Sequence, residues 1–170
     1  MRSRPRLRCS RGRTGSVAGM SDVETVERFI AAAPEAIWAL VADPRRHHEI
    51  DGSGTVRDAK NLPERLELGS KFGMSMKLGL PYSMVSEVIE FEPNRRIAWQ
   101  TYPPGPGRYV AGGRIWRYEL EPVEGGTLVR ESWDISQERV KAVVRPARNK
   151  TRASMEATLE RIERIVTDAA

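Results

Sequence analysis

The C-terminal end of the chain carries the pattern that most constrains its fold. Four apolar residues recur at spacings of four, three and four, which places them on one stripe of a helix: Met155, Leu159, Ile162 and Val166. The other faces of this helix are charged, so the stripe must be buried against another layer of structure. Pro146 either kinks the helix or marks its start, and we favour a start there, with residues 140–145 as a separate turn.

Most of the preceding chain has the pattern of an antiparallel meander. Short runs of strand-forming residues are separated by turn residues at brief intervals. We predict strands at residues 23–30, 55–59, 71–78, 82–92, 95–102, 114–122 and 127–135. Pro93-Asn94 and Glu124-Gly125-Gly126 suit hairpin turns. The stretch 103–113 is too rich in proline and glycine for a strand interior, and we expect a mobile loop there.

Two short helical segments separate the first two predicted strands. Pro34 suits the first turn of a helix, and the run PEAIWALVAD that it opens has an apolar face at helical spacing. Asp43-Pro44 ends this helix and caps a second short turn through Ile50.

The order of one strand, two short helices, six strands and a long helix is distinctive. In this order the chain resembles the SRPBCC superfamily of START-like proteins, and within it the bacterial polyketide cyclase/dehydrase and lipid-transport group. The resemblance lies in VERFIAAAPEAIWALVADPRRH, FGMSMKLGLPYSMVSEVIEFEPNRRIAW, GGRIWRYELEPVEGGTLVRESWD and the closing helix. It implies one α+β helix-grip domain over residues 20–170, in which a seven-stranded curved antiparallel sheet holds the long helix across its concave face.

The positive charge of the chain is concentrated at its front. The formal net charge of +5 would by itself suggest a nucleic-acid partner. Of the 28 basic residues, six arginines lie in residues 1–19, which contain no acid, so 22 basic residues remain against 23 acidic ones. We therefore expect a disordered leader, a near-neutral domain and no nucleic-acid partner. Met20 is the expected natural start. A leader that holds a ligand sensor on nucleic acid is the weakest alternative.

The sequence contains neither a secretory signal nor a membrane span. The leader lacks the apolar segment of a signal peptide, and no later stretch approaches the roughly 18 apolar residues that a span needs. We expect a cytoplasmic protein without stable membrane insertion, either a monomer or a homodimer. The only cysteine, Cys9, lies in the leader, so no disulfide framework, cysteine nucleophile or zinc–thiolate site is expected.

Side-chain alternation predicts which residues face the long helix. A two-residue turn at Pro93-Asn94 would pair Val88 with Trp99 and Glu90 with Ile97. Together with the resemblance, the inward set of methionines and tryptophans indicates an apolar ligand pocket, although such a set also suits a packed core. The expected ligand-binding residues are Ile50, Met74, Met76, Tyr82, Met84, Val88, Trp99, Tyr109, Trp116, Tyr118, Glu131, Trp133, Met155 and Leu159. We expect the entrance between the Ile50 region, the loop near Tyr109 and the N-terminal part of the long helix.

Tyr118 and Glu131 are the polar candidates inside this pocket. Pairing across the glycine turn would place them opposite each other on the inward face. A buried carboxylate is costly, so Glu131 should be hydrogen-bonded to the Tyr118 hydroxyl or neutral with a raised pKa. Alternatively, Glu131 lies at a wet end of the pocket, or the register is shifted by one and Arg130 faces inward.

A second polar cluster follows the first short helix and consists of His47, His48, Glu49 and Asp51. It has the groups for acid–base chemistry. Adjacent side chains on a helical turn diverge by roughly 100°, so the two histidines cannot chelate one ion together. A solvated helix end is the favoured interpretation, with His47 kept as a catalytic candidate beside Tyr118 and Glu131. We expect no metal site and no cofactor.

These observations favour a binding module, a carrier or sensor whose partner is a small hydrophobic molecule such as a lipid or polyketide-like metabolite. The alternative, also implied by the resemblance, is a cyclase or aromatase that folds a bound poly-ketone in the same cavity. The sequence shows no nucleophile turn such as G-x-S-x-G, so a Ser-His-Asp hydrolase is not indicated.

Overall fold

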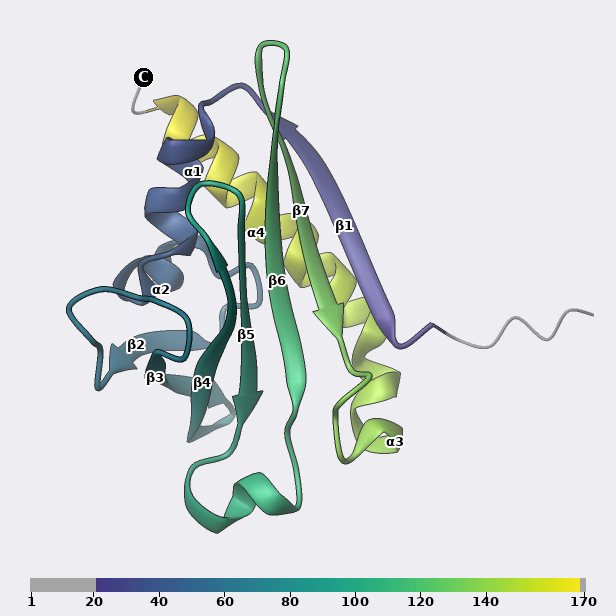
Figure 1. Cartoon of the computed structure of the whole chain (residues 1–170). Helices are drawn as coiled ribbons and strands as arrows, with labels where there is room; N and C mark the ends of the chain where they lie inside the picture. The colour runs from purple at the N-terminus through teal and green to yellow at the C-terminus, as the bar shows by residue number, and fades with distance from the viewer. Residues whose placement is uncertain (1–20, 169–170) are drawn as a thin grey trace, which may run out of the picture.

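The computed structural model describes residues 21–168. Its centre is a seven-stranded antiparallel sheet in the order β1-β7-β6-β5-β4-β3-β2 (Figure 1). The strands are β1 (Val23–Ile30), β2 (Val56–Lys60), β3 (Lys71–Leu78), β4 (Leu80–Glu92), β5 (Arg96–Tyr102), β6 (Arg114–Val123) and β7 (Gly126–Asp134). The predicted strands are confirmed, and their ends differ by at most two residues. The predicted leader and Cys9 lie outside the described residues.

The helical segments are α1 (Pro34–Val41), η1 (Pro44–Arg46), α2 (His47–Ile50), η2 (Gly105–Tyr109), α3 (Lys141–Val144), η3 (Arg145–Ala147) and α4 (Arg148–Asp168), where η marks a 3-10 helix. Helices α1, α2 and α4 lie on one side of the sheet, and η2 lies at its end in the loop between β5 and β6 (Figure 1). The helix-grip fold is thereby confirmed. Pro146 lies in the short turn before α4, so the predicted helix start is correct within two residues.

Asp43 separates the first two helices as the sequence predicts. Its side chain accepts a hydrogen bond from the backbone N–H of Arg45 at 3.0 Å and so caps η1. The loop between β5 and β6 contains η2 and no strand, in agreement with its proline and glycine content.

An ion cluster and an apolar stripe together hold α4 on the sheet. Met155 and Leu159 of the stripe are fully buried in the core. At the N-terminal end of α4, Arg148 and Arg152 hydrogen-bond the buried carboxylate of Glu24 on β1. Burial alone would raise the pKa of Glu24, but these two hydrogen bonds outweigh it and hold the pKa below its ordinary value.

The turn between α2 and β2 is held against the middle of α4. The backbone N–H of Gly52 donates to the Thr158 hydroxyl at 3.0 Å, and Arg161 donates to the carbonyl oxygen of Asp51. A β-carbon on Gly52 would collide with the carbonyl oxygen of Ser154 on α4. Only glycine therefore allows this close approach.

The β6–β7 hairpin has the predicted register. Trp116 lies opposite Trp133, and Tyr118 lies opposite Glu131. The alternative register, with Arg130 facing inward, is wrong.

The β4–β5 hairpin departs from the prediction at its tip. Val88 pairs with Trp99 as expected, but Ile97 pairs with Phe91 and not with Glu90. The connection has three residues, 93–95, and its middle residue has φ 60°, so the register near the turn is shifted by one. An irregularity between Val88 and Glu90 restores the predicted register farther along.

We expect Gly52→Ala to destabilise the protein by about 1–3 kcal/mol, because the added methyl group forces apart α4 and the turn between α2 and β2. Urea unfolding followed by circular dichroism measures this change. Gly73→Ala is the matched control, since a β-carbon there meets its nearest neighbour at an ordinary 3.4 Å. Equal stability of the two variants would show that Gly52 does not hold α4 in place.

Candidate functional site

Glu131 is a carboxyl group enclosed by the core. It lies on β7 with an exposed fraction of 3%, and its Oε2 atom is buried without a hydrogen-bond partner among the described residues. Burial raises its pKa to about 8, an effect that the Tyr118 hydroxyl opposes and the charge of Asp51 reinforces. Glu131 is therefore mostly protonated at pH 7, and it can both donate and accept a hydrogen bond.

Tyr118 is the cross-strand neighbour of this carboxyl group. It lies on β6, is 5% exposed, and pairs directly with Glu131. Burial raises the pKa of Tyr118 well above its ordinary value, and the nearby Glu131 charge adds to this effect. The phenol thus stays a neutral donor at physiological pH. Two neutral polar groups face the same part of the core.

His47 is buried against Trp99, which corrects its assignment to a solvated helix end. That interpretation holds for its neighbours His48 and Glu49, which are exposed. The Nε2 atom of His47 lies 2.9 Å from the carbonyl oxygen of Val41, so Nε2 carries the hydrogen and Nδ1 is the free acceptor. Burial lowers the pKa of His47, which favours the neutral ring.

Trp99 connects His47 to Tyr118. Its ring stacks on the imidazole with centroids 5.1 Å apart and lies 5.7 Å from the Tyr118 ring. The three proton-carrying groups that the sequence singled out are therefore in one cluster. His47 and Tyr118 each contact the indole ring of Trp99, and among the described residues no hydrogen bond joins the two side chains directly.

Most of the predicted pocket lining belongs to one continuous core cluster. Its buried members from that set are Ile50, Met74, Val88, Trp99, Tyr118, Trp133, Met155 and Leu159. Met76 and Trp116 are partly buried and pack against it. Their burial suits a packed core as well as a pocket lining, so binding of a ligand by these residues stays a prediction.

Three residues of the predicted set lie farther out. Met84 is half-buried beside Met74. Tyr82 is 41% exposed on β4, and Tyr109 is 75% exposed at the end of η2. Neither tyrosine is part of the core cluster, and their place at an entrance stays a prediction.

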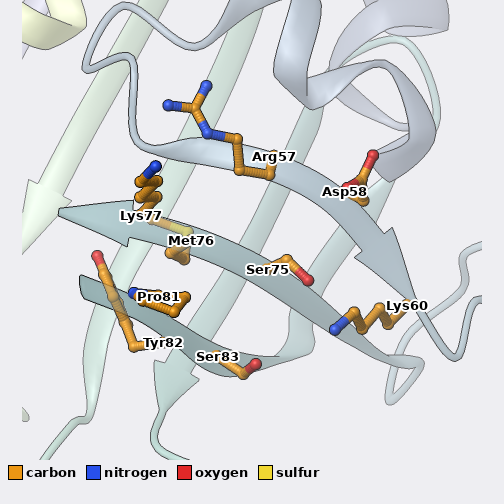
Figure 2. Close-up of a pocket in the computed structure, with 9 residues that line it drawn as sticks. All are labelled: Arg57, Asp58, Lys60, Ser75, Met76, Lys77, Pro81, Tyr82 and Ser83. Carbon is orange, nitrogen blue, oxygen red and sulfur yellow. The ribbon is translucent and has the colours of Figure 1, made fainter. Parts of the chain in front are cut away.

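Two hollows on the surface of the described residues are open to solvent. One of about 510 Å³ lies over β2, β3 and β4 (Figure 2). The other, of about 470 Å³, is lined by Trp38, Phe91 and the segment 62–66 among others. Neither is lined by Tyr118 or Glu131.

The structure also contains a buried ion pair that the sequence did not reveal. Glu138 accepts hydrogen bonds from the Gly112 N–H at 2.8 Å and from Arg114 at 3.0 Å. It thereby ties the η2 loop to the segment after β7, at the end of the sheet where an entrance was predicted. The glycine pair Gly112-Gly113 allows the loop backbone to approach the segment after β7 closely. This pair is visible in the sequence, but no pattern there identifies Glu138 as its partner.

Other site classes find little support in the described part of the chain. Within residues 21–168, no three His, Cys, Asp or Glu side chains are grouped in a way that could hold a metal ion. No helix in that range is long and apolar enough to cross a membrane.

We expect Glu131→Gln to stabilise the protein at pH 8 by roughly 1–3 kcal/mol, since it removes a buried ionisable group. The pKa of Glu131 is about 8 in the folded protein and 4.5 ordinarily, so its contribution to stability falls as the pH rises between these values. The difference in the free energy of unfolding between the variant and wild type should vanish below pH 4.5. Urea unfolding across this pH range measures this difference.

Glu119→Gln, on the same hairpin and only half-buried, is the control. If Glu131→Gln and wild type show parallel pH dependence, Glu131 is not a neutral buried acid.

Comparison with known proteins places the chain among relatives of undetermined role. It is 43% identical over 107 residues to the uncharacterized protein Rv0088 of Mycobacterium tuberculosis strain H37Rv. The match covers 62% of this chain and 44% of that protein, so it spans less than half the length of this curated relative.

Solved structures share the fold at low sequence identity. An NMR structure from Arthrobacter aurescens is 17% identical with a TM-score of 0.68, over 87% of each chain. DynU16, a protein in the dynemicin biosynthetic locus, is 17% identical with a TM-score of 0.59, over 85% of this chain and 46% of that one. Residues 23–167 match the family described as polyketide cyclase / dehydrase and lipid transport. The described helix-grip domain therefore belongs to the polyketide cyclase/dehydrase and lipid-transport family.

Proposed function

We propose that the chain binds a small, mostly apolar molecule between the concave face of the sheet and α4, as a carrier or sensor. The observation that carries this proposal is the carboxyl group of Glu131, which is buried and has one oxygen without a partner among the described residues. An orphaned buried oxygen costs stability unless a further group satisfies it. A ligand with a hydroxyl or carbonyl group would do so.

The chemistry around Glu131 defines the ligand class. The protonated carboxyl and the Tyr118 hydroxyl can hold one neutral polar group, while Trp99, Trp133 and Met155 surround them with apolar area. A charged headgroup would be poorly solvated at this depth. We therefore expect a neutral lipid or polyketide-like molecule with a single polar end.

Entry of the ligand would require movement, because the residues that would line its site are buried. Methionine side chains adapt to new shapes more easily than branched ones, and Met74 and Met155 both belong to this buried core. The entrance would lie between Ile50, the loop at Tyr109 and the first turns of α4. At this end of the sheet Glu138 joins the η2 loop to β7, and it would act as a hinge point.

Two steps test this function on the full chain. Native mass spectrometry with solvent extraction first identifies any retained lipophilic molecule. Uptake of the apolar dye N-phenyl-1-naphthylamine is then measured by fluorescence, with decanol and decane as competitors. We expect Glu131→Leu to weaken competition by decanol roughly tenfold, since one buried hydrogen bond is lost. Competition by decane should be unchanged.

Glu119→Leu is the matched control, on the same hairpin and with its side chain on the opposite face from Tyr118 and Leu120. It should behave as wild type. A wild-type protein that takes up neither dye nor any extracted molecule would contradict ligand binding. Equal loss of decanol and decane competition in Glu131→Leu would contradict the assigned polar contact.

A cyclase or aromatase is the second candidate function. It is favoured by a neutral carboxyl that pairs with the Tyr118 phenol, and by the His47 imidazole, which stacks on the same Trp99 ring as that phenol; these groups could move protons on a bound poly-ketone. The family description, which names polyketide cyclase / dehydrase, supports the same class. Turnover of a poly-ketone substrate that survives replacement of Tyr118, Glu131 and His47 together would exclude these groups as proton donors and acceptors.

A further inference from the structure

A hollow at the corner of the sheet has a polar lining on the outer face. Met76 and Tyr82 of the predicted ligand-binding set also line it, but Tyr118 and Glu131 do not. The hollow lies over three neighbouring strands, with Lys60 from β2, Ser75 and Lys77 from β3, and Ser83 from β4 (Figure 2). Its volume is about 510 Å³. This volume exceeds what a single phosphate group needs, so the hollow can accept a phosphate with its substituent.

The two serines form the floor of this hollow. Ser75 and Ser83 are directly opposite each other in the β3–β4 register, so their hydroxyl groups share one face. The Ser75 Oγ atom is buried and has no hydrogen-bond partner among residues 21–168. Rotation of this hydroxyl toward the hollow would let it donate to an oxyanion, which would supply the missing partner.

The rim of the hollow is positively charged. Lys60, Lys77 and Arg57 outnumber the single acid, Asp58. Across the described part of the chain, none of these three cations takes part in an ion pair with a carboxylate. Gly73 has no side chain, and Lys60 extends over it into the hollow. The hollow thus matches a phosphate in both charge and hydrogen bonding.

An exposed apolar tip adjoins the hollow. Strands β3 and β4 are joined through Gly79, which has φ 73°, and the residues on either side are Leu78 and Leu80. These two leucines are 62% and 80% exposed. Large apolar side chains this exposed beside a cationic rim are the arrangement of a surface that binds the lipid interface.

We propose that this corner of the sheet docks on anionic phospholipid bilayers. A lipid phosphate occupies the hollow between Ser75, Lys60 and Lys77, while Leu78 and Leu80 enter the boundary between headgroups and acyl chains. This contact is peripheral, and Glu131 does not line the hollow. The contact would bring the domain to the membrane whether its inner ligand is a lipid or another metabolite.

Co-sedimentation of the full chain with vesicles tests the proposal. The vesicles are phosphatidylcholine with or without phosphatidylglycerol. We expect binding only to the mixed vesicles, and a loss of at least about tenfold in the partition coefficient for Lys60→Ala/Lys77→Ala, since each cation near an anionic surface contributes measurably. Leu78→Ser/Leu80→Ser should lose a similar factor through its missing apolar contact.

Matched variants elsewhere separate this site from general charge and hydrophobicity. Lys150→Ala/Arg164→Ala removes two exposed cations from α4, and Leu68→Ser removes one leucine that is 66% exposed. Both should bind as wild type. The Arg-rich residues 1–19 are present in every variant, so equal binding by all variants would assign the membrane contact to them and overturn the proposal.

An experiment with a soluble phosphate compound distinguishes binding of a lipid headgroup from binding of free phosphate. Glycerol 3-phosphate is titrated into the protein and followed by NMR shifts of the Ser75 and Lys77 amides. Competition by this compound against mixed vesicles supports the proposal. Saturable binding of it without any vesicle binding would make the hollow a site for soluble phosphates and overturn membrane docking. Circular dichroism confirms that each variant is folded.

Discussion

The packing of α4 against the sheet is the interaction on which the rest of the structure depends. The buried Glu24 carboxylate pairs with Arg148 and Arg152 at one end of the helix, and Gly52 permits close contact at its middle. The apolar stripe along the same helix is withdrawn from water, which provides most of the driving force. Breaking only one partner of the ion cluster would leave an uncompensated buried charge.

The same packing creates the environment of Glu131. Closing α4 over the concave face removes water from this carboxyl group, and the resulting loss of hydration raises its pKa to about 8. A core selected for stability alone would have an apolar residue at this position. Retaining an acid with an unsatisfied oxygen beside Tyr118 is understandable when a ligand completes its hydrogen bonding. Fold and binding chemistry are thus linked through one helix.

Local patterns explain why so much of the fold could be predicted from the sequence. Alternation in β6 and β7 and a glycine turn were sufficient to place Tyr118 opposite Glu131, because a hairpin register follows from its turn. The predicted register at the β4–β5 tip was wrong for the same reason. Asn94 adopts a positive φ, and the connection has three residues in place of two.

Long-range contacts could not be predicted from the sequence patterns. The burial of His47 depends on Trp99, which lies on a different element, and nothing near the histidine pair signals that contact. The link between Glu138 and Gly112 joins loops whose pairing follows only from the assembled sheet. The hollow over Ser75 and Ser83 likewise needs three strands in register before its charges meet.

The most direct test of this account is the titration of the Glu131 carboxyl carbon, followed by ¹³C NMR in protein freed of ligand. The account predicts that Glu131 remains protonated at pH 7 and ionises with a midpoint of about 8. Addition of a ligand that hydrogen-bonds the neutral acid should shift this midpoint upward. A midpoint at the ordinary value of 4.5 would contradict the account, because the carboxyl group would then be hydrated and could not form the polar end of an apolar site.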